Sequence, residues 1–585
     1  MTYLFGFVVL LGVLIFIHEL GHFLLAKACG VRVETFSIGM GHKILKFTRG
    51  ETEYALSLIP LGGYVKLTGQ DPREEVPKEL ENRSFRHKAI WQRTLVVLAG
   101  PIFNAALTMF IFFFLYLMGA PSAAPVVERV LSGSIAAQAG LQSGDWVHSI
   151  TTPAGKVYST RELSDLEDTL NEHVGEELTL AVQHDPAWAS SSTNSEIKIV
   201  PAKGFTRDST LGVLLERGLI PGTEKQSRAP LLHVRPGTWA ATRQIPEAFW
   251  IESVEVQVGS FSESYPIRTY GEFERLWTRL GEKTATANEG QIIVRGQQMQ
   301  LSQVENASEP AELPTTSYTL AWTRLQDRMP ATPDAAGLSS SELVVLEVKE
   351  KTPAATLGLK QGDEILTLNG ENVQSFLWFR EHLQDLAHTN KEIQISWRRG
   401  SEILKASVIP EKVSTTDPVT EAKKEQFQIG AAFLALPGAP MTYTLKSSGF
   451  VDAIELGWKK SVNLSISMVA SFYYLATGEI SPKTLGGPLL IGKIAGESVK
   501  QGWEAFLKMM AFISLNLFIL NLLPVPVLDG GHLVLFAIEA VRRKPVSLKI
   551  VEVWTTTGFF LLMGLVAVVF FNDLSRLGLF KIFGS

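Results

Sequence analysis

The chain has 585 residues, of which 46% are hydrophobic, and its mean hydropathy is positive. This length accommodates several domains, and the composition is typical of a protein that is partly embedded in a membrane and partly soluble. A formal net charge of −5 gives no basis for a nucleic-acid partner. The single cysteine, Cys29, excludes an intrachain disulfide framework and a cysteine-rich zinc site.

The first 29 residues are almost entirely apolar, but His18, Glu19 and His22 interrupt them. The run is long enough to span a bilayer, and it lacks the basic start and the cleavage site of a signal peptide. On a helix the two histidines project from one face, one turn apart. This is the His-Glu-x-x-His arrangement, in which two imidazoles hold zinc and the intervening Glu activates the metal-bound water. Ionisable groups at membrane depth are costly and mark function, which argues against two ordinary buried histidines. We predict a transmembrane helix over 1–29, with the histidines as metal ligands and Glu19 as the catalytic base.

Residues 30–93 combine strand-like patterns with glycines and many basic side chains. Two runs, 31–38 and 53–59, predict small membrane-associated β-hairpins. Two interpretations stay open: an exposed strand edge beside the first helix pairs with an extended substrate, or the hairpins are purely structural. The lysines and arginines place this loop in the cytoplasm by the positive-inside rule, so we expect the N-terminus to lie outside.

A second transmembrane helix is predicted over 94–119. Gly100 and Asn104 lie one turn apart in it, which allows close packing against a neighbouring helix and offers that neighbour an amide. Because this helix leads out of the cytoplasm, we expect the long region after Met118 to be extracytoplasmic.

Three 21-residue segments of this outer region align without a gap, and they begin at Val130, Val234 and Val348. The first and third copies carry Ser/Thr-x-Ala-Ala-x-x-Gly-Leu-x-x-Gly-Asp, which resembles PDZ domains, whereas the middle copy has Gln244 and Phe249 in place of the first Gly and the Asp. The repeat predicts α+β PDZ-like domains over 124–220 and 340–437 and a degenerate PDZ-like domain over 221–335. Two interpretations stay open: at least one copy binds an extended peptide at its sheet edge, or the modules only block access sterically.

The last third of the chain returns to the membrane. Within 445–500, residues 461–476 are apolar, but the stretch is short and rich in Ser, Asn and Tyr, so we expect 445–500 to be an amphipathic segment along the interface. A third transmembrane helix is predicted over 503–532, and it runs through two prolines into the motif Leu-Asp-Gly. Prolines at membrane depth are tolerated where the backbone lines a cavity, so Asp529 suits a third metal ligand. A fourth transmembrane helix, 555–572, then returns the C-terminus to the outside.

Three features together resemble the site-2 protease family: the His-Glu-x-x-His motif at 18–22, Leu-Asp-Gly at 528–530, and PDZ-like modules between the second and third helices. Within that family the resemblance is to the bacterial RseP branch of intramembrane zinc metalloproteases. It weakens over roughly residues 221–341, because that branch usually carries two PDZ modules. The fold expected is a polytopic α-helical membrane protein with four transmembrane helices, membrane-associated β-hairpins and extracytoplasmic α+β PDZ-like domains.

The resemblance implies a role for each motif residue. The implied ligands of a Zn²⁺ cofactor are His18, His22 and Asp529. Three protein ligands leave a fourth position for water, and Glu19 is the implied general base. Asn516 and Asn521 are implied to hold the substrate backbone, although an interhelical hydrogen bond explains either asparagine equally well. His532 is not assigned, since no fourth protein ligand is needed.

The resemblance also implies a function, namely regulated intramembrane proteolysis in the bacterial inner membrane. The expected partners are the lipid bilayer and single-pass membrane proteins, such as anti-sigma factors already cleaved on the outer side and remnant signal peptides. Periplasmic PDZ-like modules would gate substrate access. A different class of function is a non-catalytic PDZ scaffold with a structural metal, in which Glu19→Gln would leave function intact. A metal transporter would need further carboxylates or histidines, and the later helices offer only Asp529 and His532.

Overall fold

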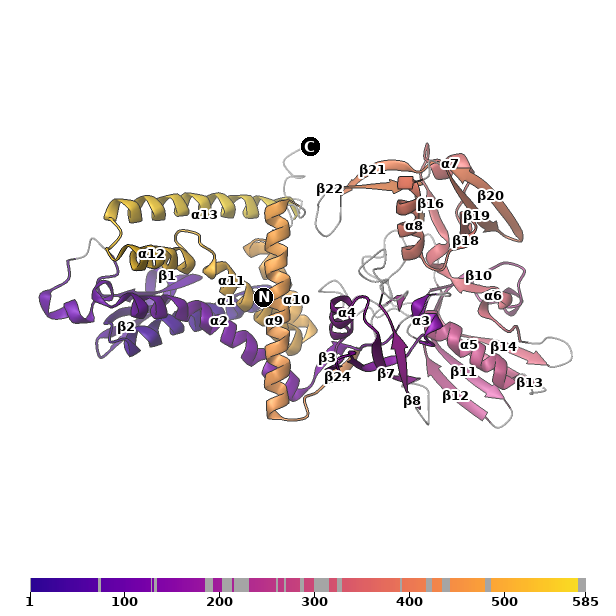
Figure 1. Cartoon of the computed structure of the whole chain (residues 1–585), viewed down its shortest axis with the longest axis horizontal. Helices are drawn as coiled ribbons and strands as arrows, with labels where there is room; N and C mark the ends of the chain where they lie inside the picture. The colour runs from indigo at the N-terminus through magenta and orange to yellow at the C-terminus, as the bar shows by residue number, and fades with distance from the viewer. Residues whose placement is uncertain are drawn as a thin grey trace. The chain divides into compact units, whose positions relative to one another are not determined.

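The structure is a computed structural model. It describes residues 2–71, 75–127, 129–130, 134–184, 193–201, 213–214, 231–258, 261–267, 270–284, 289–298, 315–323, 329–389, 392–416, 423–433, 442–478 and 485–576. The chain divides into two compact units (Figure 1). Unit 1 comprises residues 1–120, 416–423 and 444–585, and unit 2 comprises residues 121–415 and 424–443.

Unit 1 is built mainly from long helices. These are α1 (Thr2–Ala28), α2 (Ile90–Met118), α9 (Phe450–Thr477), α10 (Pro488–Gln501), α11 (Trp503–Leu522), α12 (Asp529–Arg542) and α13 (Leu548–Arg576). Within the described parts of the chain, four of them, α1, α2, α11 and α13, are long and apolar enough to cross a membrane. This number agrees with the four transmembrane helices expected from the sequence.

The segment predicted as a third helix over 503–532 is divided in two. α11 ends at Leu522 and α12 begins at Asp529, with Pro524 and Pro526 between them. Proline lacks the backbone N–H that a helix needs, and it disfavours the helical conformation of the residue before it. Leu523, which precedes the first proline, is accordingly extended, with φ −62° and ψ 143°. Two other helices begin earlier than predicted: α2 starts at residue 90 instead of 94, and α13 starts at residue 548 instead of 555.

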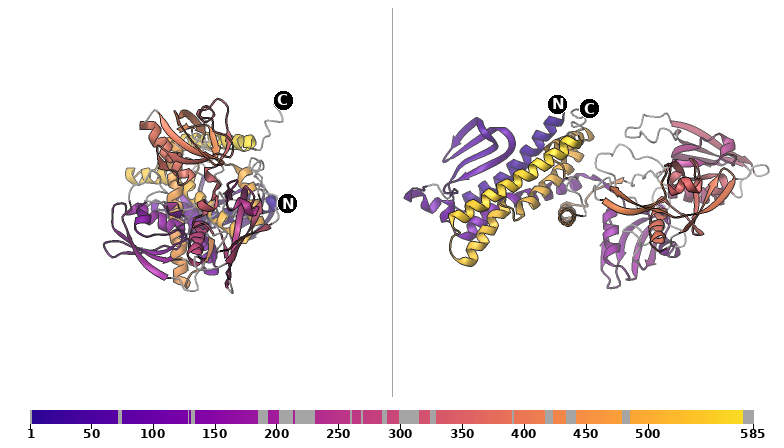
Figure 2. Two further views of the ribbon diagram at one scale, coloured as in Figure 1. Left: turned by 90° about the vertical axis from the view of Figure 1, so that its right-hand side faces the viewer. Right: turned by 90° about the horizontal axis from the view of Figure 1, so that it is seen from above.

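A single long hairpin lies beside the helices of unit 1 (Figure 2), where the sequence predicted several small ones. Its strands β1 (Val33–Arg49) and β2 (Thr52–Leu67) pair antiparallel, with shifts in register between Val33 and Leu45. Phe36 and Val65 share a buried apolar cluster with Ala26 of α1. The two predicted strand runs are therefore parts of one ribbon that is anchored on the first helix.

α9 runs across the other long helices of unit 1. It lies at full length in Figure 1 and is seen end-on in the right view of Figure 2, where α13 lies in the plane. Gly457 of α9 lies against the backbone of Phe113 in α2. Trp458, Ile466 and Tyr473 on α9 are exposed. A helix with exposed large apolar side chains that crosses a bundle suits the predicted interfacial position, which stays a prediction.

Unit 2 contains three modules that correspond to the three repeat copies, each with its own buried apolar core. The first module contains β4 (Arg129–Val130), α3 (Ile135–Gln138), β5 (Trp146–Thr151), β6 (Val157–Ser159), α4 (Leu163–Glu172), β7 (Leu178–His184), β8 (Thr193–Ile199) and β9 (Val213–Leu214). The middle module contains β10 (Leu231–Val234), β11 (Ala248–Val258), β12 (Phe261–Pro266), α5 (Tyr270–Thr284), β13 (Glu289–Gln298), β14 (Thr315–Thr323), α6 (Pro333–Ala336) and β15 (Leu338–Ser340). The third module contains β16 (Val345–Val348), α7 (Pro353–Leu357), β17 (Glu364–Leu368), β18 (Glu371–Asn372), α8 (Phe376–Thr389), β19 (Ile393–Arg399), β20 (Glu402–Val408) and β23 (Ala431–Phe433). Four other strands are β3 (Ala120–Ala123), β21 (Glu411–Thr416), β22 (Lys423–Gln428) and β24 (Thr442–Leu445).

The first and third modules repeat one another in detail. Their four-stranded sheets have the equivalent orders β6-β5-β7-β8 and β18-β17-β19-β20. The last residue of each motif, Asp145 or Asp363, accepts a hydrogen bond of 2.8 Å from the backbone N–H three residues earlier. Each aspartate also pairs with a side chain of the next strand in the sheet, His184 at 2.9 Å or Arg399 at 2.6 Å. The motif therefore encodes a turn closed by a buried carboxylate.

The middle module keeps the turn but not the carboxylate. Gln244 has φ 63°, in the left-handed region that Gly140 and Gly358 occupy in the other copies, with φ 88° and 78°. Phe249 replaces the aspartate and is fully buried in the core of the module. The middle module also has one six-stranded sheet, with β12 paired to β11 beside the order β14-β13-β11-β10-β15. An apolar contact thus takes the place of the ion pair.

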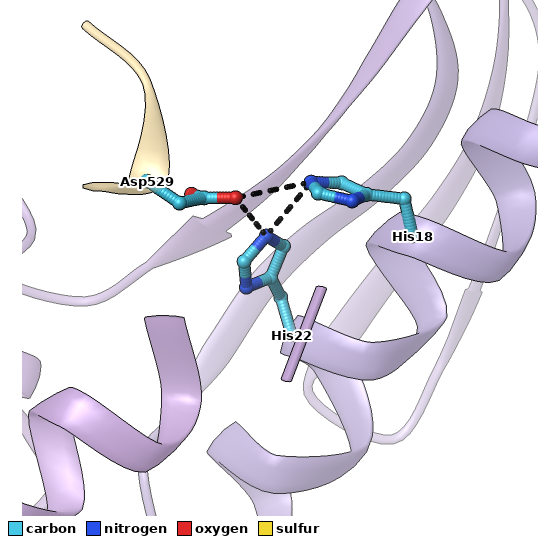
Figure 3. A group of neighbouring side chains, drawn as sticks. All are labelled: His18, His22 and Asp529. Carbon is cyan, nitrogen blue, oxygen red and sulfur yellow. Dashed lines mark hydrogen bonds and ion pairs between the residues drawn. The ribbon is translucent and has the colours of Figure 1, made fainter. Parts of the chain in front are cut away.

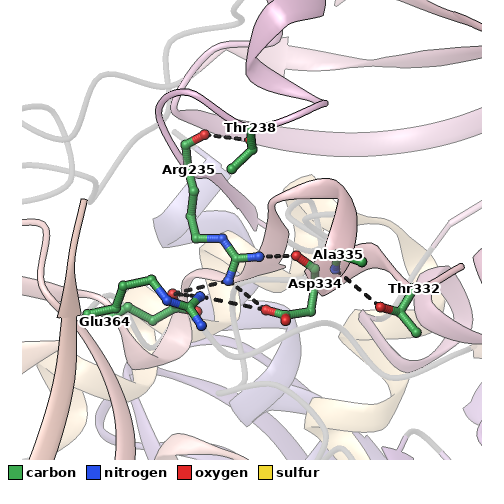
Figure 4. A network of polar contacts seen from close by, with 7 residues as sticks. Arg235, Thr238, Thr332, Asp334, Ala335 and Glu364 are labelled. Carbon is green, nitrogen blue, oxygen red and sulfur yellow. Dashed lines mark hydrogen bonds and ion pairs between the residues drawn. The ribbon is translucent and has the colours of Figure 1, made fainter. Parts of the chain in front are cut away.

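Arginines join the middle module to both of its neighbours. Arg275 of α5 donates to the carbonyl oxygen of Ser143, at 2.5 Å, and to the buried Asp145, at 3.2 Å. On the other side, Figure 4 shows Arg235 beside Asp334 of its own module and Glu364 of the third module. Both carboxylates also have a partner in their own module, His184 for Asp145 and Arg398 for Glu364, so the arginines of the middle module add a second partner to each.

We expect the stability of the middle module to depend on pH through His233 in β10. Burial, with a further contribution from the charge of Arg235, lowers the pKa of His233 to about 4. An unfolded histidine titrates near pH 6.5, so the unfolded state binds more protons between these two values. Stability should be fully present above about pH 6.5 and should fall by up to about 3 kcal/mol as the pH drops towards 4.

Hydrogen exchange of β10 and β11 in the full-length protein in detergent, corrected for intrinsic rates, measures this loss. His233→Gln, which stays neutral, should flatten the pH dependence, whereas His148→Gln at an exposed position should not. The same pH profile in wild type and His233→Gln would contradict the assignment.

We also expect Asp573 to stabilise unit 1 by capping α10 from another helix. Its carboxylate accepts hydrogen bonds from the backbone N–H groups of Gly487, Leu489 and Leu490, at 2.9, 3.0 and 3.2 Å. Asp573→Ala leaves one buried and two part-buried donors unpaired, so it should cost about 1–3 kcal/mol. Asp573→Asn keeps an acceptor and should cost less. Thermal unfolding in detergent measures both effects, and unchanged midpoints would contradict the capping role.

Candidate active site

Three possible metal-ligand atoms converge inside unit 1 (Figure 3). His18 and His22 lie one turn apart on α1, and Asp529 is the first residue of α12. The two histidine Nε2 atoms are 3.2 Å apart. Oδ2 of Asp529 lies 3.3 Å from Nε2 of His18 and 3.6 Å from Nε2 of His22. The structure thus brings together the three residues that the sequence singled out as ligands.

The spacing of these atoms fits a tetrahedral zinc ion. Nitrogen and oxygen ligands lie about 2.0–2.2 Å from zinc, so neighbouring ligands of a tetrahedron are about 3.3–3.6 Å apart. The three distances of 3.2, 3.3 and 3.6 Å match this value. Two imidazoles and one carboxylate form a donor set that leaves a fourth position open. Within the described residues, no second group of three His, Cys, Asp or Glu side chains has such a geometry.

The break between α11 and α12 determines where Asp529 lies. Val527 has φ 82°, a conformation that a β-branched residue adopts rarely and that turns the chain sharply before α12. A Cβ atom at Gly530 would collide with the carbonyl oxygen of Leu523. Only glycine therefore lets α12 begin so close to the end of α11. The Leu-Asp-Gly sequence is explained by this close approach, which directs the carboxylate towards α1.

α2 packs against both histidine rings on α1. Nδ1 of His22 lies 2.8 Å from the carbonyl oxygen of Val96 and donates to it. A donating Nδ1–H leaves the lone pair on Nε2, which faces Asp529. A Cβ atom at Gly100 would collide with the imidazole rings of His22 and His18. This explains the close helix packing that the sequence predicted around Gly100.

A cavity of about 960 Å³ lies against these residues. Glu19 lines it beside the two histidines, and Gly63 and Tyr64 of β2 line it too. α13 closes part of the wall. His532 lines the same cavity but is not one of the three converging side chains. The arrangement can hold a metal ion, place an acidic side chain beside it and admit an extended chain along the hairpin.

The two asparagines lie elsewhere. Asn516 and Asn521 are on α11, both half-buried, and neither lines this cavity. Their role in holding a substrate backbone therefore stays a prediction.

Sequence reasoning missed one feature of the cavity wall. Arg93 of α2 binds Glu539 of α12 through two hydrogen bonds of 2.7 and 3.1 Å, and both residues line the cavity. The two residues are 446 positions apart, and no local pattern links them. Arg93 is one of many basic residues before and at the start of α2, and Glu539 is an acidic residue within the apolar sequence of α12, so only the three-dimensional packing reveals the pair.

Comparisons with known proteins bear on the chemistry of this site. Protease RseP of Yersinia pestis is 29% identical over 573 residues, and regulator of sigma E protease of Haemophilus influenzae is 29% identical over 574 residues. A relative from Vibrio cholerae, 28% identical over 581 residues, carries the words zinc metalloprotease in its name. Each alignment covers 98% of this chain and 98% of the relative. Among solved structures, the PDZ domain of an SdrC-like protein from Listeria monocytogenes matches 16% of this chain and 90% of that domain, at 21% identity and a TM-score of 0.13.

A family model described as peptidase family M50 matches residues 6–565, which is nearly the whole chain. Its relatives share the length and order of the chain and include proteases named for the regulation of sigma E. The chain therefore belongs to peptidase family M50 and is a zinc metalloprotease of the site-2 protease type.

Proposed function

We propose that this protease hydrolyses peptide bonds inside the transmembrane segment of single-pass membrane proteins, with His18, His22 and Asp529 as zinc ligands and Glu19 as the general base. The observation that carries the proposal is the triangle of donor atoms, 3.2–3.6 Å on a side, in a unit with four helices long enough to cross a membrane. Anti-sigma factors already trimmed on the outer side and remnant signal peptides are the substrate classes proposed.

The residues divide the chemistry among them. Bound zinc lowers the pKa of a water molecule and polarises the scissile carbonyl. Glu19 lies between the two ligand histidines in sequence and lines the cavity, so its carboxylate can take the proton of the attacking water. It then delivers that proton to the leaving amine. His22 is held in the ligand tautomer by the carbonyl oxygen of Val96.

The substrate must unwind to reach this site, because a helix hides its backbone in its own hydrogen bonds. Gly63 and Tyr64 of β2 line the cavity beside Glu19. We propose that an unwound segment adds to this part of the hairpin as a further strand. Asn516 and Asn521 remain candidates for holding the substrate backbone, from the family resemblance.

We propose the bacterial inner membrane as the location, with the hairpin on the cytoplasmic side and unit 2 in the periplasm. The loop before α2 and the segment 542–549 are both rich in basic residues, which favours the cytoplasm for both. The Arg93–Glu539 pair supports this, because it joins the start of α2 to the end of α12 at one end of unit 1. Both chain termini then lie outside.

The modules of unit 2 are proposed to gate the substrate. Modules in this position would exclude proteins with bulky outer domains and admit those already trimmed. Binding of an extended peptide by the first or third module is the second proposal for them. The identity of the peptide is left open.

Glu19→Gln should separate metal binding from catalysis. We expect the variant to keep about one zinc per chain, since all three ligands remain, and to lose cleavage by at least about 100-fold, since the base is gone. Zinc content and cleavage of a tagged single-pass model substrate are measured on full-length protein in detergent. Glu455→Gln, at an exposed position of α9, is the matched control and should behave as wild type. Cleavage by Glu19→Gln at the wild-type rate would overturn the base assignment.

The single cysteine makes the topology directly testable. In a Cys29→Ser background, Lys198→Cys in the first module and Arg49→Cys in the hairpin each introduce one thiol at an exposed position. In intact spheroplasts an impermeant maleimide should label Lys198→Cys, and it should label Arg49→Cys only after the membrane is permeabilised. The reverse pattern would contradict the proposed orientation.

A further inference from the structure

We infer that Asn104 of α2 is a positioning residue for His18, and that it holds this imidazole in the tautomer that binds the metal. The inference rests on the proposed ligand role of His18. The side-chain amide of Asn104 lies 3.2 Å from Nδ1 of His18, and Asn104 is fully buried.

The chemistry of the ring determines what Asn104 must supply. Nε2 of His18 faces His22 and Asp529, so Nε2 is the atom available to the metal. When Nε2 is a ligand, Nδ1 carries the proton and donates a hydrogen bond. Its partner must therefore be an acceptor, and among uncharged side chains an amide oxygen serves this purpose well.

Asn104 can serve both forms of the ring. Its Nδ2 faces Nδ1 in the structure, which suits a histidine whose Nδ1 is unprotonated. Its buried Oδ1 has no hydrogen-bond partner among the described residues, so a half-turn of the amide breaks no other bond of that oxygen. The turned amide presents Oδ1 to Nδ1–H. Metal loading is thus coupled to the orientation of one buried amide.

The backbone of Asn104 is fixed in place by the neighbouring helix. Its carbonyl oxygen accepts hydrogen bonds from Ser514 of α11, at 2.8 Å, and from Thr108, at 3.2 Å. Thr108 also reaches the carbonyl oxygen of Ala511, at 3.0 Å. Because α11 leads into α12 and Asp529, the same helices that position the carboxylate also position the amide.

The two histidines are supported by consecutive turns of one face of α2. Val96 accepts from His22, Asn104 contacts His18, and Gly100 lies between them where a Cβ atom would collide with both rings. Residues 96, 100 and 104 are spaced by four and share that face. α2 therefore supplies one hydrogen-bond partner for each histidine, and its glycine between them leaves room for both rings.

Removing the amide should weaken metal binding. Partners of ligand histidines typically contribute 10–100-fold in metal affinity. We expect Asn104→Leu to bind zinc about 10–100-fold more weakly than wild type and to change the visible spectrum of the Co²⁺-substituted protein. Asn104→Asp retains an acceptor for Nδ1–H and should recover most of the affinity. Zinc affinity is measured by competition with a chromophoric chelator on full-length protein in detergent.

Ile111→Ala is the matched control, since Ile111 is also buried in α2, lies about two turns from Asn104 and offers no hydrogen bond to His18 or to α11. It should leave zinc affinity and the Co²⁺ spectrum unchanged. Equal losses in Asn104→Leu and Ile111→Ala would show a packing effect and overturn the inference. Wild-type affinity with an unchanged spectrum in Asn104→Leu would overturn it too. His18→Ala tests the ligand assignment separately: if it binds zinc as wild type does, the proposed site itself fails.

Discussion

The fold of unit 1 is constrained by three ionisable side chains at membrane depth, because each of them needs a polar partner there. An unpaired carboxylate in such a place costs several kcal/mol, and the cost is removed only by partners in the correct geometry. Asp529 finds them in His18 and His22, at 3.3 and 3.6 Å. To bring them together, the third apolar segment must break and α1 must approach α2 at Gly100. The irregular features of the fold are thus consequences of one electrostatic requirement.

In unit 2, the last position of the repeat motif is buried in all three copies, but it is occupied by two chemically different kinds of side chain. The first and third copies bury an aspartate and supply it with a backbone N–H and a neighbouring side chain. The middle copy removes the charge and buries Phe249 instead. Two arginines of the middle module form ion pairs with carboxylates of the neighbouring modules: Arg275 pairs with Asp145, and Arg235 pairs with Glu364. The additional module therefore contributes a second basic partner to two buried carboxylates, which are also paired with His184 and Arg398 of their own modules.

The features that the sequence could predict are those carried by local spacing. Two histidines four residues apart, long apolar runs, a gapless repeat and two prolines before an aspartate each have one straightforward structural meaning. The joining of two strand runs into one ribbon was not predictable, because it depends on packing against α1. The pairs Arg93–Glu539 and Asn104–His18 were not predictable either, since their partners are 446 and 86 residues apart. From the sequence, Asn104 was predicted only to offer its amide to a neighbouring helix, and the partner residue was not identified.

Most of the side chains of the site come from α1 and α2. This explains why an insertion of about 300 residues is tolerated between the second and third apolar segments. Two of the proposed ligands and the proposed base lie within one turn and a half of α1, so most of the reactive geometry is local. α2 forms a hydrogen bond with each of the two imidazoles. The later part of the chain adds a single carboxylate, whose position depends on the break after α11 and on the packing of α11 against α2. The inserted modules can therefore vary without disturbing the proposed catalytic centre, provided that α11 returns to the same face of α2.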